Sequence, residues 1–168
     1  MSKFFPLFIA IFLIFLSSCS SKKGMGVSQE KSSHISAIAF SKANKLLKEE
    51  CESWIGTPYK YGGNDRDGID CSGLVLQIYL KVYDIKLPRT SLMQSEFCKE
   101  IKPGKIKVGD LVFFATGHDI NRISHVGLML DEENFIHSSS KKGVVISSLN
   151  TPYYQRTFKM FGRPGHDR

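Results

Sequence analysis

The chain has 168 residues, of which 42% are hydrophobic and 23% are charged. This composition is typical of a globular protein and excludes a largely disordered chain. The length leaves room for one compact domain once the chain ends are set aside. A formal net charge of +7 favours general attraction to anionic lipids or wall polymers, and no motif indicates a nucleic-acid partner.

Residues 1–18 are typical of a bacterial lipoprotein signal peptide. Lys3 supplies positive charge, and the apolar run Leu7 to Leu16 suits a signal-peptide core but is short for a membrane span. Leu16-Ser17-Ser18-Cys19 resembles a lipobox, which implies cleavage before Cys19 and lipidation of its thiol. Ser20 resembles the residue that permits sorting to the Gram-negative outer membrane, so we expect an anchored protein facing the periplasm. The alternative is a plain secretory signal.

The mature chain is expected to begin with a flexible tether over residues 19–33, which is rich in Ser, Lys and Gly. The remaining residues, 34–168, form the predicted domain. A first helix is predicted from about Ile35 to Trp54, where apolar residues recur along one side. Gly56-Thr57-Pro58 ends this helix and leads into a glycine-containing loop.

A second helix is predicted from Cys71 to about Tyr83, since the apolar positions repeat with helical spacing. Asp70 precedes it and is a good N-cap residue. A thiol in the first turn lies near free backbone N–H groups and the positive end of the helix dipole, which favour the thiolate. Because the thiolate is the nucleophilic form, Cys71 is a candidate nucleophile. A third, short helix is predicted from Thr90 or Ser91 to about Cys98.

Short β-strands dominate the chain after Pro103-Gly104. Connections of hairpin length between them predict an antiparallel sheet with the helices on one side, an α+β fold. The segments expected to form strands are Leu111 to Phe114, Ser124 to Leu130, Asn134 to Ser138, Val144 to Ile146 and Phe158 to Arg163.

Two of the five histidines lie on neighbouring predicted strands. A tight turn between these strands would bring His125 and His137 to one face of the sheet. His125 could then take the proton of Cys71, and His137 could fix the tautomer of His125. His34 and His166 are interpreted as solvent-exposed residues. His118 is interpreted as a surface residue on a loop, with a contact at the rim of the substrate site as the alternative.

Two donors are expected to stabilise an oxyanion that forms beside Cys71. The first is the backbone N–H of Cys71, and the second is the hydroxyl of Tyr59 on the preceding loop.

Six motifs in this order resemble the NlpC/P60 family of cell-wall peptidases, and the resemblance covers about residues 40–164. They are Gly56-Thr57-Pro58-Tyr59-Lys60-Tyr61-Gly62-Gly63, Asp70-Cys71-Ser72-Gly73, Leu87-Pro88-Arg89, Gly109-Asp110-Leu111-Val112-Phe113-Phe114, Ser124-His125-Val126-Gly127 and Phe135-Ile136-His137-Ser138.

This resemblance implies a reduced papain-like fold and a thiol peptidase that works without metal or other cofactor. It implies that Cys71 is the nucleophile, His125 the base, His137 its orienting residue and Tyr59 the oxyanion donor. Asp70 and Ser72 match substrate-binding positions. The implied substrate is peptidoglycan, cut through an acyl-enzyme at D-Ala–meso-diaminopimelate or γ-D-Glu–meso-diaminopimelate bonds. The expected oligomeric state is a monomer.

Three other functions are compatible with parts of this pattern. They are a papain-like acyltransferase or amidase, an inactive wall-binding lipoprotein, and a zinc site made of Cys71, His125 and His137. Histidine tends to precede cysteine in the acyltransferases, whereas here it follows. For Cys51 and Cys98 two states remain open, a disulfide, which an exported location permits, or two unpaired thiols.

Overall fold

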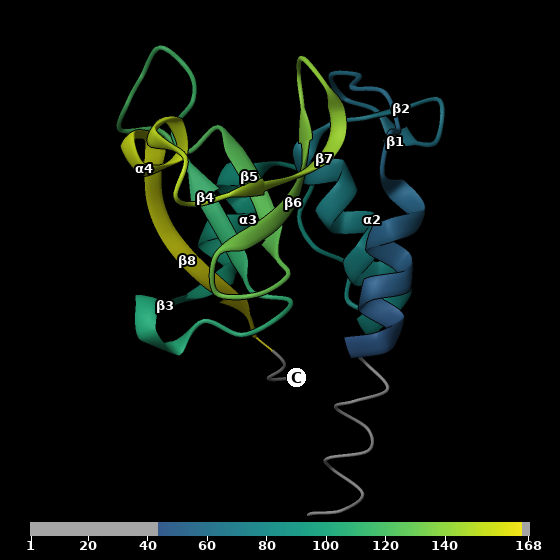
Figure 1. Ribbon diagram of the computed structural model, residues 1–168, viewed down its shortest axis with the longest axis horizontal. Coiled ribbons are helices and arrows are strands. Elements are labelled where there is room, and N and C mark those ends of the chain that lie inside the picture. Colours follow the sequence, from purple (N-terminus) through teal and green to yellow (C-terminus); the bar gives the residue numbers. More distant parts are fainter. Residues whose placement is uncertain (1–43, 166–168) are drawn as a thin grey trace, which may run out of the picture. The chain divides into compact units, whose positions relative to one another are not determined.

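The computed structural model describes residues 44–165, and Figure 1 shows the order of their elements. A first helix covers residues 44–54 of this range. The elements that follow are β1 (Asn64–Asp65), β2 (Gly68–Ile69), α2 (Cys71–Tyr83), α3 (Ser91–Phe97), β3 (Cys98–Ile101), a 3₁₀ turn (Pro103–Lys105), β4 (Leu111–Phe114), β5 (His125–Met129), β6 (Asn134–Ser139), β7 (Gly143–Ser148), α4 (Pro152–Thr157) and β8 (Phe158–Pro164).

Six strands form one sheet in the order β3-β8-β4-β5-β6-β7, and every neighbouring pair is antiparallel. Strands β4 to β7 follow one another as hairpins, as the short connections predicted. The last strand, β8, returns to lie between β3 and β4. The predicted α+β fold with an antiparallel sheet is therefore confirmed.

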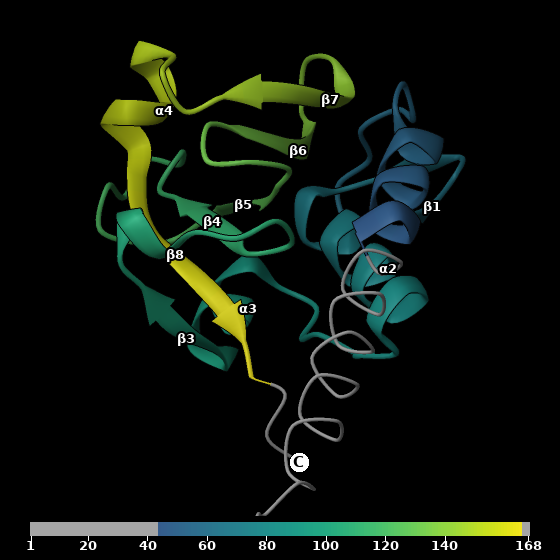
Figure 2. The same cartoon turned by 60° about the horizontal axis from the view of Figure 1, so that its bottom comes forward.

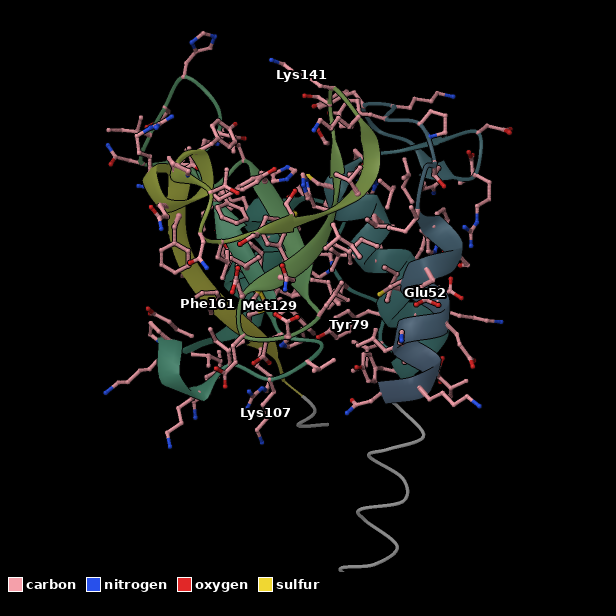
Figure 3. All side chains as sticks on the ribbon, viewed as in Figure 1. Glu52, Tyr79, Lys107, Met129, Lys141 and Phe161 are labelled. Carbon is pink, nitrogen blue, oxygen red and sulfur yellow. The ribbon has the colours of Figure 1, made fainter. Side chains whose placement is uncertain are left out.

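Helix α2 and the first helix lie together on one side of the sheet (Figure 2). The buried face of α2 includes Leu74 and Ile78, which join one apolar cluster with Leu47 of the first helix and Val126 and Leu128 of β5. The hydroxyl of Tyr79, labelled in Figure 3, donates to the backbone carbonyl of Gly109. These contacts hold α2, whose first residue is Cys71, against β5 and against the segment that precedes β4.

A second apolar cluster covers the opposite face of the sheet, and α4 contributes to it. The ring of Tyr154 on α4 packs against Phe114 and Phe135, and Met129 and Phe161, both labelled in Figure 3, belong to the same cluster. The prediction placed helices on one side only. It missed α4 because this helix has six residues, too few to show a helical repeat.

Several predicted features fall outside the described residues. These are the signal peptide, Cys19, the tether, the part of the first helix before residue 44, and His34 and His166. Within residues 44–165, Cys51 and Cys98 are free thiols rather than a disulfide, and burial raises the pKa of each to about 12. No helix in that range has the length and apolar character needed to cross a membrane.

Candidate active site

Cys71 is the first residue of α2, and its side chain is 8% exposed. The residue before it, Asp70, has extended backbone geometry, and its carboxylate accepts from the Gly73 N–H at 2.7 Å. This is the N-cap arrangement that the sequence predicted. The cap fixes the junction at which the chain becomes helical, and so it sets the position of the thiol.

The thiol of Cys71 favours its neutral form, unlike the sequence-based expectation. Burial raises its pKa to about 11, although backbone N–H groups of Val126, Ser72 and Cys71 itself act in the opposite direction. The charge of Asp70 raises the pKa further. The helix terminus is therefore not sufficient to produce a resting thiolate.

His125 and His137 meet on one face of the sheet, as predicted. Strands β5 and β6 pair with Leu128 opposite Ile136, so the two histidines project to the same side. His125 Nε2 lies 2.9 Å from His137 Nδ1, and the rings pack edge to face with centroids 5.0 Å apart. Gly127, two residues after His125 on β5, leaves room for the Phe135 ring, because an added Cβ there would come within 2.4 Å of that ring.

Both imidazoles are neutral at physiological pH. Burial lowers the pKa of His125 to about 3, with a further contribution from the neighbouring His137 charge. Burial likewise lowers the pKa of His137 to about 4. A neutral His125 can accept a proton, so the resting site combines a protonated thiol with an available base.

Alkylation of Cys71 by iodoacetamide should therefore become faster with each step in pH between about pH 6 and pH 9, because the thiolate fraction rises throughout that interval. Residue-specific mass spectrometry after timed quenching measures this rate separately from Cys51 and Cys98. A plateau near neutral pH would instead indicate a preformed thiolate–imidazolium pair and would contradict the expectation.

Two hydroxyl groups contact the far nitrogen of His137. Ser147 Oγ on β7 and the Tyr154 hydroxyl on α4 each lie 3.0 Å from His137 Nε2. Sequence reasoning did not identify either residue. The only available signal was their position in a polar and aromatic segment that follows His137.

Tyr59 lies on the loop beside α2, in a parallel bridge with Ile69. Burial raises the pKa of its phenol, and the charges of Cys71 and Asp70 raise it further by smaller amounts. Tyr59 therefore lies close to both residues. Its hydroxyl makes no hydrogen bond to another residue within 44–165. This hydroxyl is therefore available as a donor to a bound molecule.

Asp70 and Ser72 belong to a polar network around Arg89. The guanidinium donates to both Asp70 carboxylate oxygens at 2.8 Å and to Ser72 Oγ at 3.0 Å. The Gly62 N–H donates to Asp70 at 2.9 Å. Burial acts to raise the pKa of Asp70, but the hydrogen bonds from Arg89, Gly73 and Ser72, together with the Arg89 charge, outweigh it and hold the pKa below its usual value. The carboxylate oxygens are thus fully engaged within the protein.

Two clefts meet at Cys71, and Tyr59, Cys71 and Ser124 line both. The larger has a volume of about 610 Å³ and includes Asp70, Ser72, Arg89, His118 and Arg122. The smaller, about 400 Å³, contains His125, His137, Tyr154 and the lysines of the β6–β7 turn, of which Figure 3 labels Lys141. The candidate residues thus face one extended groove.

Among residues 44–165, no group of three or more His, Cys, Asp or Glu side chains is arranged to hold a metal ion.

A cysteine at the start of a helix, combined with histidines on an adjoining antiparallel sheet, defines the class of papain-like cysteine peptidases. The model of the NlpC/P60 family matches residues 56–163. The chain belongs to the NlpC/P60 family, whose members are cysteine peptidases.

Relatives and solved structures agree with this assignment. A probable endopeptidase of Haemophilus influenzae is 38% identical over 154 residues, covering 89% of this chain and 91% of the relative. The murein DD-endopeptidase MepS/murein LD-carboxypeptidase of Escherichia coli is 34% identical over 112 residues, covering 67% of this chain and 58% of that protein. An NlpC/P60 protein from Bacillus cereus superposes with a TM-score of 0.65 at 33% identity, covering 72% of this chain and 40% of that one.

Proposed function

We propose that this protein hydrolyses peptide bonds of peptidoglycan through a covalent thioester on Cys71. The observation that carries the proposal is the groove in which Cys71, the His125–His137 pair and the free hydroxyl of Tyr59 lie together. Cys71 supplies the nucleophile, His125 the base and Tyr59 an oxyanion donor, which are the three functions that thiol hydrolysis needs, and His137 orients the base.

In the proposed reaction, His125 takes the proton of the Cys71 thiol as the sulfur attacks the peptide carbonyl carbon. His125 Nε2 is hydrogen-bonded to His137, so Nδ1 is the nitrogen available for this proton. The backbone N–H of Cys71 and the Tyr59 hydroxyl donate to the oxyanion. His125 then returns the proton to the leaving amine, and the C–N bond breaks. In the second half of the cycle His125 takes a proton from water as the water oxygen attacks the thioester carbon, and the C–S bond breaks as His125 returns that proton to the Cys71 sulfur.

The positive charges in the groove favour a substrate with free carboxylates. Exposed cations lie on both sides of Cys71, with Arg122 in the larger cleft and Lys141 and Lys142 in the smaller one. Peptidoglycan stems carry carboxylates on γ-D-Glu and meso-diaminopimelate, which these cations complement. The E. coli relative is named a murein endopeptidase. We place the cleavage at a D-Ala–meso-diaminopimelate or a γ-D-Glu–meso-diaminopimelate bond, with Asp70 and Ser72 forming the groove wall beside it.

Digestion of purified sacculi, followed by mass spectrometry of the released muropeptides, tests this function directly. Cleavage of cross-links should convert dimers to monomers, whereas cleavage within stems should release short peptides. EDTA is expected to leave the activity intact, and iodoacetamide is expected to abolish it. Activity that EDTA removes and alkylation spares would refute thiol hydrolysis.

We also propose that Cys19 is lipidated and anchors the enzyme to the outer membrane, which the lipobox-like sequence Leu16-Ser17-Ser18-Cys19 supports. Cys19→Ala is expected to move the protein out of the membrane fraction. Its catalysis should be unchanged, because the described domain contains every proposed catalytic residue. Fractionation of cells followed by immunoblotting measures the change, and membrane retention of the variant would contradict the proposal.

A further inference from the structure

His137 Nε2 faces two hydroxyl oxygens at the same distance. Ser147 Oγ and the Tyr154 hydroxyl are each 3.0 Å away. Burial raises the pKa of Tyr154, and the nearby Ser147 hydroxyl acts in the opposite direction. The Tyr154 ring is held in place by edge-to-face packing against His137 and Phe135.

The proposed reaction requires one particular tautomer of each imidazole, and the present inference rests on that proposal. His125 can accept the thiol proton at Nδ1 only if its own proton is on Nε2. That N–H then donates to His137 Nδ1, 2.9 Å away, so His137 must carry its proton on Nε2. In the opposite arrangement, His137 Nδ1–H donates to His125 Nε2, and the His125 proton faces the thiol and blocks it.

The two oxygens favour the productive arrangement. A ring nitrogen offers either one N–H or one lone pair in the ring plane. An N–H can be shared between two acceptor oxygens in a three-centre hydrogen bond, whereas a single lone pair accepts well from only one hydroxyl. Two oxygens at an equal 3.0 Å therefore match an N–H on Nε2.

We propose that Ser147 and Tyr154 are positioning residues that hold His137 as the Nε2–H tautomer and thereby keep His125 Nδ1 free to accept the Cys71 proton. Ser147 has the decisive part in this arrangement. A phenol is a strong donor, and without Ser147 the Tyr154 hydroxyl would be left to donate its own proton to His137 Nε2. That donation would reverse both tautomers.

Ring ¹⁵N–¹H correlation spectra of the resting, uniformly labelled protein test the tautomer without reference to activity. The expected result is that His137 carries its proton on Nε2 and His125 carries its proton on Nε2. In Ser147→Ala both protons should move to Nδ1. A His137 proton on Nδ1 in the unmodified protein would overturn the inference, even if the enzyme proves to be a thiol peptidase.

Kinetics provide the second test. Ser147→Ala should lower kcat by roughly 10- to 100-fold, as is common for outer hydrogen-bond partners, with little change in KM, and Ser147→Thr should recover most of the loss because it keeps the hydroxyl. The double variant Ser147→Ala/Tyr154→Phe should be more active than Ser147→Ala, because the phenol donor is gone. Ser148→Ala is the matched control, since its hydroxyl pairs with Glu133. Losses that simply multiply in the double variant would show that the hydroxyls only support the ring, and would refute the tautomer role.

Discussion

Cys71→Ala is expected to lower peptide release from sacculi by on the order of 10⁴-fold or more, because no other group in the groove can form the thioester. The fold should survive the change. Alanine is the best helix former, and the Asp70 cap bonds to the backbone of Gly73 rather than to the thiol. The free energy of unfolding should change by about 1 kcal/mol or less. Muropeptide analysis and thermal unfolding measure the two effects.

Cys51→Ala is the matched control for this experiment, since Cys51 is also a buried free thiol. Cys51 lines a separate apolar cleft beside the first helix, so the Cys51→Ala variant should leave activity unchanged. His125→Ala should lose nearly as much activity as Cys71→Ala, and His137→Ala should lose less, because orientation contributes less than proton transfer. Cleavage of sacculi by the Cys71→Ala protein would exclude the proposed mechanism.

The elements that place the site were predictable because each has a strong local signal. Helix α2 begins and ends where the apolar spacing and the Asp70 cap predicted, and α3 is capped by Thr90. Strands β5 and β6 agree with the prediction to within a residue or two. In contrast, β3 and the β1–β2 hairpin were missed, because these strands have only two to four residues and are defined by their pairing partners.

The parts of the site that escaped prediction depend on contacts between distant segments. Ser147 and Tyr154 reach His137 only because β7 pairs with β6 and α4 turns back over the sheet. The effect of burial on the pKa of Cys71 was not predicted either. The helix start favours a thiolate, but packing against the neighbouring elements removes water, and the cost of desolvation is larger. Burial of this kind is a tertiary property with no local sequence signal.

Asp70→Ala is expected to destabilise the domain by about 3 kcal/mol, which corresponds to a fall in Tm of roughly 10 °C. The change removes the cap of α2, worth about 1 kcal/mol, and leaves Arg89 without its carboxylate. Loss of one partner of a buried ion pair costs about 3–5 kcal/mol. The Arg89 side chain, however, is 37% exposed, so water can solvate it and the loss of the pair costs less than this range, about 2 kcal/mol. Thermal and urea unfolding measure the loss.

Asp70→Asn separates the two contributions, because asparagine caps helices well but cannot accept the paired Arg89 hydrogen bonds as a carboxylate does. Its stability should lie between those of the unmodified protein and Asp70→Ala. The pKa of Asp70 is lowered in the folded state, so its ionic contribution is present above the unfolded-state pKa of about 3.9 and is lost as the pH falls through the lower folded value. The difference between the unmodified protein and Asp70→Asn should therefore shrink below about pH 4. Asp67→Ala, an exposed aspartate of the same loop, should change stability by less than about 0.5 kcal/mol. A difference between the unmodified protein and Asp70→Asn that persists unchanged into acid would mean that the Asp70–Arg89 pair contributes no electrostatic stability.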